Sequence, residues 1–226
     1  MIADPRAVAA SWPDERLRAI AELAVAVTEA PWAMTRANLK RAHQAGLTDD
    51  DVLHVLALSA YFGHLNRIAD AVAVPLDYEV RHRPPATDPS APGLATAPRP
   101  LVGRPAIEVS RRPATATAIA EWRDYAFKRD LPLTRRQRHV IARWVALWLG
   151  DGGISAPDDL TINPLDDALR VLAEQLTLAP WKLDDTSFAT LRAAGYDDAA
   201  LFDACATASV AGLLSRLNVA LVALAI

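Results

Sequence analysis

Apolar positions along this chain are mostly alanine and leucine, and they gather in stretches bounded by proline, glycine or acidic residues. No stretch alternates Val, Ile, Thr or aromatic residues with polar ones, as a half-buried strand would. Alanine and leucine are also among the strongest helix formers. The pattern therefore predicts an all-α fold, with helices at about 14–28, 35–44, 49–74, 116–129, 134–149, 165–178, 184–194 and 198–224.

The sequence resembles itself at a fixed offset of 149 positions. An offset held without a gap over about fifty residues indicates that one helical unit was duplicated. We therefore expect two tandem repeats, packed pseudo-symmetrically into one helical bundle. The aligned motifs are Leu23-Ala24, Thr28 and Ala30-Pro31-Trp32 with Leu172-Ala173, Thr177 and Ala179-Pro180-Trp181, and Gly63-x-Leu65-x-Arg67 with Gly212-x-Leu214-x-Arg216.

Between the two repeats lies a segment whose composition opposes helix formation. Residues 79–115 contain eight of the sixteen prolines, with six arginines scattered among them. Such a segment is typical of an extended linker. The expected organisation is a first repeat of three helices over 1–78, the linker over 79–115, and a second repeat over 116–226 that has two additional helices at its start.

Composition and charge limit the classes of function. A net charge of −3 provides no field for nucleic acid, and aromatic residues are not interleaved with the short arginine runs. The apolar stretch 209–226 contains Arg216 and Asn218, which indicates a buried helix rather than a membrane span. One cysteine, Cys205, and an N-terminus without signal-peptide design favour a reducing cytoplasm. The abundance of Ala, Arg and Pro is typical of a GC-rich bacterial genome.

Several motifs resemble the carboxymuconolactone decarboxylase and alkylhydroperoxidase D superfamily, in particular its peroxidase-related branch. They are Leu172-Ala173-Glu174-Gln175-Leu176-Thr177-x-x-Pro180, the segments 43–50 and 191–198, and Tyr61-Phe62-Gly63-His64-Leu65-Asn66-Arg67-Ile68-Ala69-Asp70. The resemblance covers 14–78 and 130–222, about two thirds of the chain. It implies an all-helical, AhpD-like fold that assembles into homo-oligomers, and it implies that 133–149 leads into the active site.

The sulfur chemistry of that superfamily is missing from this chain. Peroxidatic members carry two cysteines three residues apart, because one thiolate attacks the peroxide and the other resolves it. After Trp148 this chain has Leu149-Gly150-Asp151-Gly152-Gly153-Ile154, with no cysteine, and Cys205 has no second thiol to resolve it. A dithiol peroxidase mechanism is excluded on these grounds.

The strongest candidate site lies on the predicted helix 49–74. Tyr61, His64, Asn66, Arg67 and Asp70 stand within ten residues of an otherwise apolar helix, whereas the aligned positions of the second repeat keep only the arginine. His64, Arg67 and Tyr61 are the candidate catalytic residues, with His64 as general acid or base and Arg67 as anion clamp. Candidate substrate-binding residues are Asn66, Asp70 and Trp32.

Most of these residues could instead have a purely structural role. Arg67 and Asp70 can tie helices together, and we favour that role for Arg67 because both repeats keep it. Trp32 is more typical of a core wedge than of a ligand platform. Arg135-Arg136-x-Arg138-His139 could attract an anion, but a charge run is usually a solvated face. For His64 the two roles are evenly balanced.

Two functions follow as expectations. The first is a cofactor-independent, non-redox enzyme of decarboxylase, lyase or isomerase type acting on a small metabolite, and Arg67 allows that metabolite to be an anion. The second is a catalytically inactive binding or assembly protein of the same fold. No metal is expected, since Asp51 and His54 have no third ligand at a suitable spacing. The expected partners are a small-molecule ligand and further copies of the chain, without nucleic acid or membrane.

Overall fold

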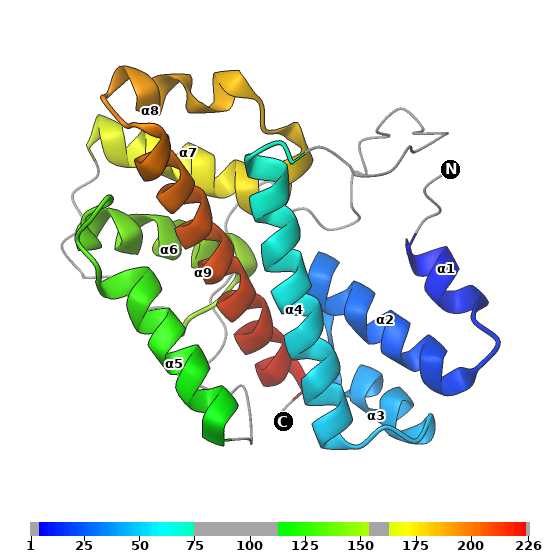
Figure 1. The fold of residues 1–226 in the computed structure, drawn as a ribbon. Helices are drawn as coiled ribbons and strands as arrows, with labels where there is room; N and C mark the ends of the chain where they lie inside the picture. The colour runs from blue at the N-terminus through cyan, green and yellow to red at the C-terminus, as the bar shows by residue number, and fades with distance from the viewer. Residues whose placement is uncertain (1–4, 75–112, 154–162, 225–226) are drawn as a thin grey trace.

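The structure is a computed structural model that describes residues 5–74, 113–153 and 163–224. The regular elements in these ranges are all helical, as predicted (Figure 1). The α-helices are α1 (Pro5–Ser11), α2 (Glu15–Glu29), α3 (Arg36–Gln44), α4 (Asp49–Ala71), α5 (Pro113–Lys128), α6 (Arg135–Leu149), α7 (Pro164–Leu178), α8 (Ala189–Ala193) and α9 (Asp198–Leu224), and the 3-10 turns are η1 (Pro31–Ala33), η2 (Pro180–Lys182) and η3 (Asp185–Phe188).

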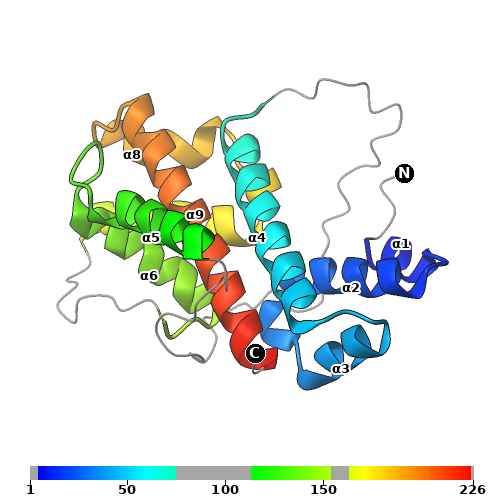
Figure 2. The same cartoon turned by 60° about the horizontal axis from the view of Figure 1, so that its bottom comes forward.

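Helix α9 forms the centre of the bundle. In both views it runs between α4 on one side and α5 and α6 on the other (Figures 1 and 2). Leu201, Ala204 and Cys205 pack into a core with α6 and α7, whereas Leu213, Leu217 and Leu221 pack into a second core with α2 and α4. One long apolar helix therefore supports both ends of the molecule.

The same helix is long and apolar enough to cross a membrane, judged by length and composition alone. However, 78% of its apolar window is buried inside the protein. Arg216 lies within it and donates to backbone carbonyls of two other helices. The helix therefore has the burial of a core helix in a soluble protein.

The bounds of the elements repeat at the offset found in the sequence. Helix α2 and turn η1 begin and end 149 residues before α7 and η2, and α4 begins 149 residues before α9. The backbone dihedral angles also agree at the residue that follows each helix. Ala30, after α2, has φ −148° and ψ 64°, and Ala179, after α7, has φ −147° and ψ 61°. Gly46 and Gly195 both adopt left-handed φ values, 81° and 92°. The superposition of whole halves stays a prediction.

Some expected bounds were wrong. Helix α4 ends at Ala71 rather than near residue 74, and Ala73 has a positive φ of 49°. Helix α5 begins at Pro113, inside the segment assigned to the linker, because proline suits the first turn of a helix. Helix α1 was not predicted, and the expected helix 184–194 is turn η3 followed by α8. Most of the linker, residues 79–112, lies outside the described residues.

Candidate functional site

His64 lies on the buried face of α4 and contacts α9. Its side chain is 6% exposed, and its Nδ1 lies 2.9 Å from Oγ of Ser209. The Ser209 hydroxyl donates in turn to the carbonyl oxygen of His64, at 2.8 Å. Since that hydroxyl hydrogen is used, Nδ1 must carry the hydrogen that it shares with Ser209. The pair therefore fixes the neutral tautomer and leaves Nε2 as an acceptor.

The ring of His64 is surrounded by aromatic residues. Trp122 of α5 meets it edge to face, with ring centroids 5.0 Å apart, and Tyr61 lies 6.3 Å away. Burial lowers the pKa of His64 below its usual value, and the positive charge of Arg67 lowers it further. At neutral pH the imidazole is therefore uncharged, which suits a general base but equally suits a packed core residue.

Arg67 and its counterpart Arg216 make the same local contact. Each guanidinium donates through NH1 to the glycine carbonyl four residues earlier, at 2.8 Å to Gly63 and 3.2 Å to Gly212. A side chain on either glycine would crowd that guanidinium, since an added Cβ would lie 3.1 Å or 3.0 Å from it. Glycine at both positions therefore makes room for the arginine.

Arg216 also joins α9 to two other helices. It donates to the carbonyl of Thr28 near the end of α2 and to that of Thr177 near the end of α7, both at 3.2 Å. These carbonyls occupy equivalent positions and lack partners within their own helices, as is usual in a last turn. Arg67 makes no such bridge, and its buried Nε has no hydrogen-bond partner in the described part of the chain. Burial lowers the pKa of Arg67 to about 10, although the charge of Asp70 opposes this.

The structure brings together only some of the predicted site residues. Tyr61 and His64 are neighbours, whereas Asn66 and Asp70 are exposed on α4. Trp32 packs against the core of α6, α7 and α9, as expected for a wedge. Three hollows in the described part of the chain, one beside α1 to α3, one between α5 and α6 and one beside α3, are lined by residues other than His64 and Arg67.

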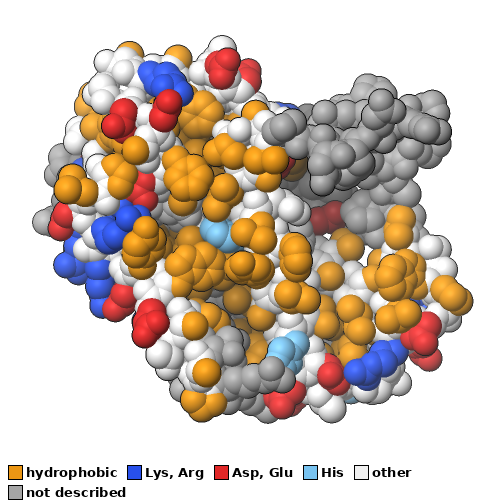
Figure 3. All heavy atoms as spheres, in the orientation of Figure 1, with side chains coloured by type: hydrophobic (Ala, Val, Ile, Leu, Met, Phe, Trp, Pro, Cys, Tyr) orange, Lys and Arg blue, Asp and Glu red, His pale blue; other side chains and the backbone are white. Residues whose placement is uncertain are grey.

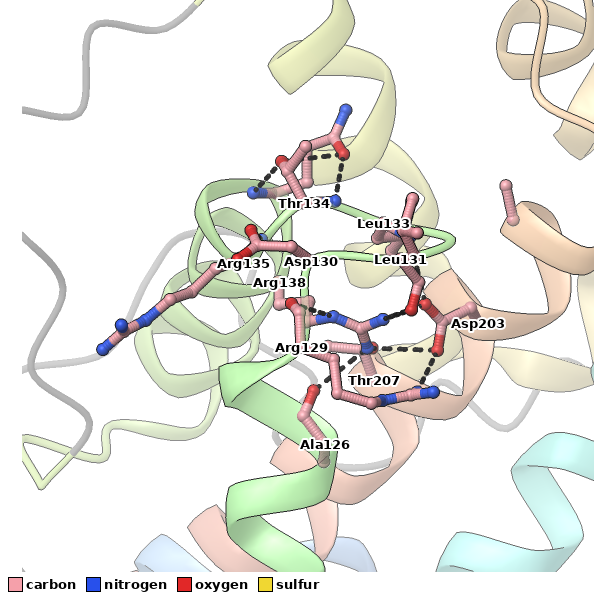
Figure 4. Close-up of polar contacts among 12 residues, drawn as sticks. Ala126, Arg129, Asp130, Leu131, Leu133, Thr134, Arg135, Arg138, Asp203 and Thr207 are labelled. Atoms are coloured by element: carbon pink, nitrogen blue, oxygen red, sulfur yellow. Dashed lines mark hydrogen bonds and ion pairs between the residues drawn. The ribbon is translucent and has the colours of Figure 1, made fainter.

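The arginine run at the start of α6 is only partly a solvated face. Arg138 is fully buried and pairs with Asp203 of α9 through both nitrogens of its fork (Figure 4). Asp203 also accepts from Arg129, at 2.9 Å, and from the backbone amide of Leu133. Arg136 makes a bidentate pair with Asp166. These two arginines fasten α6 to the rest of the fold.

Another buried polar group, Asp151, directly follows Gly150, the C-cap of α6. Asp151 is 2% exposed and accepts from the amide of Gly153, at 2.7 Å, and from Asn218 of α9. Burial raises the pKa of the Asp151 carboxyl, and these hydrogen bonds oppose the rise. The hydroxyl of Ser215 faces this carboxyl. Asp151 was not predicted, although a carboxylate after a helix-ending Gly150 was visible in the sequence.

The outer face of α4 is apolar. Leu58, Phe62 and Leu65 of α4 and Val72, the residue directly after it, which together we call the α4 seam, are 60%, 54%, 39% and 45% exposed. Figure 3 shows hydrophobic side chains gathered across the face that α4, α5 and α9 form in Figure 1. The seam lies opposite the buried positions Leu56, Ala60 and His64 of the same helix. Helix α4 is therefore apolar on both faces over this length.

Neither metal nor thiol chemistry has a visible site in the described ranges. No group of three or more His, Cys, Asp and Glu side chains there could hold a metal ion. Cys205 is buried, and burial raises the pKa of its thiol to about 12. A thiol with that pKa is almost entirely protonated near neutral pH and is therefore a poor nucleophile.

Comparisons with known proteins found no relative. No family model matches the sequence, and no curated protein or solved structure matches it.

Proposed function

We propose that this chain is a binding or assembly protein that acts through the α4 seam, where it packs against the α4 seam of a second copy. The single observation that carries the proposal is the exposure of Leu58, Phe62 and Leu65 on a helix whose opposite face is already buried. Large exposed apolar patches on soluble proteins usually mark interaction surfaces.

The spacing of the seam favours a helix as the partner surface. Leu58, Phe62, Leu65 and Val72 are separated by four, three and seven residues, which is the heptad spacing of helices that pack along one another. When two copies meet around a two-fold axis, their α4 helices run antiparallel. Each seam then packs against the other, and both are buried in one contact. Aromatic residues such as Phe62 and the neighbouring Tyr61 are typical centres of such contacts.

The test is the molar mass in solution, measured by light scattering after size exclusion. The wild type is expected to elute as a dimer or a higher oligomer, and Phe62→Glu as a monomer, because the charge would have to be buried without a partner. Val171→Glu on α7 is the matched control, since Val171 is 46% exposed outside the seam. A monomeric wild type, or equal masses for both variants, would contradict the proposal.

The enzyme hypothesis is the second candidate, and the geometry of His64 is what favours it. Ser209 holds the ring in one tautomer with Nε2 as the acceptor, the arrangement that a positioned general base requires. Incubating the protein with a mixture of small carboxylic acids and following the mixture by mass spectrometry tests it. A substrate consumed by the wild type but spared by His64→Asn supports a non-redox lyase or isomerase. Equal consumption by both proteins, or none, contradicts it.

The proposal has three further parts. The chain belongs to the AhpD-like superfamily, it arose by tandem duplication, and it works in a bacterial cytoplasm. The recurrence of element bounds at 149 residues supports the duplication. The buried, protonated state of Cys205 supports a function without redox chemistry.

A further inference from the structure

A hollow of about 320 Å³ lies between α5 and α6, away from the α4 seam. Its lining is mostly apolar and includes Phe127, Ala142 and Leu214, together with Gly153. Pockets for small molecules start at about 300 Å³ and combine mostly apolar walls with a few polar groups. The hollow therefore has the size and the lining of a site for a small ligand.

The rim of this hollow is positively charged. Arg123, Lys128 and Arg135 line it, against one carboxylate, Asp124. His139 also lines it, but burial and the charge of Arg135 lower its pKa, so it adds no positive charge at neutral pH. Asp124 pairs with Lys128 at 2.6 Å, so these two charges cancel. This cluster contrasts with the chain as a whole, whose net charge is −3.

The two arginines are available to a ligand. Within the described ranges, neither the guanidinium of Arg123 nor that of Arg135 makes an ion pair or a hydrogen bond. The backbone amide of Arg135 donates to Asp130, but its side chain points away from Asp130 and from the buried arginine network (Figure 4). Arginine binds carboxylates with two parallel hydrogen bonds, which makes it the usual residue for that purpose.

From these observations we propose that the hollow binds a small organic carboxylate, with the apolar body on Phe127 and Leu214 and the carboxylate between Arg123 and Arg135. Half-buried His139 lies beside them on α6 and offers a further hydrogen bond. The proposal goes beyond self-assembly and does not depend on it, because none of these residues belongs to the α4 seam.

The rest of the fold supports this site. Arg138 follows Arg135 by less than one turn and is fixed to Asp203 of α9, so the first turns of α6 are held in place. Asp151 accepts from the amide of Gly153, which also lines the hollow. A ligand would therefore meet a wall that is already ordered, which lowers the entropic cost of binding.

The test uses benzoate and hexanoate as probes, titrated into the isotope-labelled full chain and followed by NMR. Benzamide, which has the ring without the charge, and inorganic phosphate, which has charge without an apolar body, are the ligand controls. Saturable shifts are expected for the carboxylates and should include the amides of His139 and Gly153. Benzamide and phosphate should bind at least about tenfold more weakly.

Two variants test the rim. Arg123→Gln with Arg135→Gln should weaken carboxylate binding about tenfold or more, because charge-assisted hydrogen bonds are lost. Arg143→Gln is the matched control, since Arg143 is an exposed arginine of α6 outside the hollow. The proposal is overturned if neither carboxylate saturates, if benzamide binds as well as benzoate, or if Arg143→Gln weakens binding as much as the double variant.

Discussion

Replacing Asp203 by alanine should destabilise this protein more than the loss of any surface ion pair. Asp203 accepts four hydrogen bonds, two of them from the fork of Arg138, whose side chain is 0% exposed. Its removal leaves the Arg138 charge buried without its carboxylate. Breaking a buried pair in this way costs about 3–5 kcal/mol.

Equilibrium urea unfolding, followed by circular dichroism, measures the effect. Asp124→Ala is the control, because Asp124 pairs with Lys128 on the surface, where both side chains are about half exposed. Such a pair contributes less than about 1 kcal/mol. Replacing both buried partners, as Asp203→Leu with Arg138→Met, should recover most of the lost stability, since no buried charge is then left alone.

The result that would refute this reasoning is a free energy of unfolding for Asp203→Ala within about 1 kcal/mol of the wild type. Arg138 would then find water or another acceptor, and the fastening of α6 to α9 would not depend on the ion pair.

Three further predictions follow from buried groups. Cys205, whose pKa is raised to about 12, should react with a thiol reagent at pH 8 only as fast as the protein unfolds, so adding urea should accelerate labelling sharply. Gly212→Ala should lower the melting temperature, whereas Gly63→Ala should leave it unchanged or raise it. Arg216 is held by the carbonyls of Thr28 and Thr177 and cannot yield to the new methyl group, whereas Arg67 lacks these two hydrogen bonds and can. Because the pKa of His64 is lowered in the folded state, the unfolded chain takes up a proton first on acidification. Stability should therefore fall as the pH drops below about 6.5, and less steeply in His64→Gln.

Much of the fold could be predicted because local signals and the repeat agree. Thr48 with its aspartates starts α4, Pro31 and Pro180 break two helices at equivalent places, and Gly46 and Gly195 end two more. Helix α1 was missed because it has only seven residues and neither an acidic first turn nor a basic last turn.

The environment of the candidate site was harder to predict, because it depends on contacts between distant residues. His64 is held by Ser209 from 145 positions away, and the sequence shows this serine only as one small polar residue in an apolar helix. The arginine run 135–138 looked uniform, yet Arg138 is buried and Arg135 is not. Helical spacing alone could separate the faces of α6, but it could not predict which of these faces packs against Asp203.

The most direct test of the central claim, self-assembly through the α4 seam, is a cross-link between copies at Leu65. Leu65 lies near the middle of the seam, so in an antiparallel contact the Leu65 residues of two copies lie close together. In the variant Leu65→Cys with Cys205→Ala, mild oxidation should convert most of the protein into a covalent dimer, while Val171→Cys in the same background should form no disulfide between copies. If the Leu65 variant also forms no disulfide between copies, the seam does not join two copies and the proposed function is wrong.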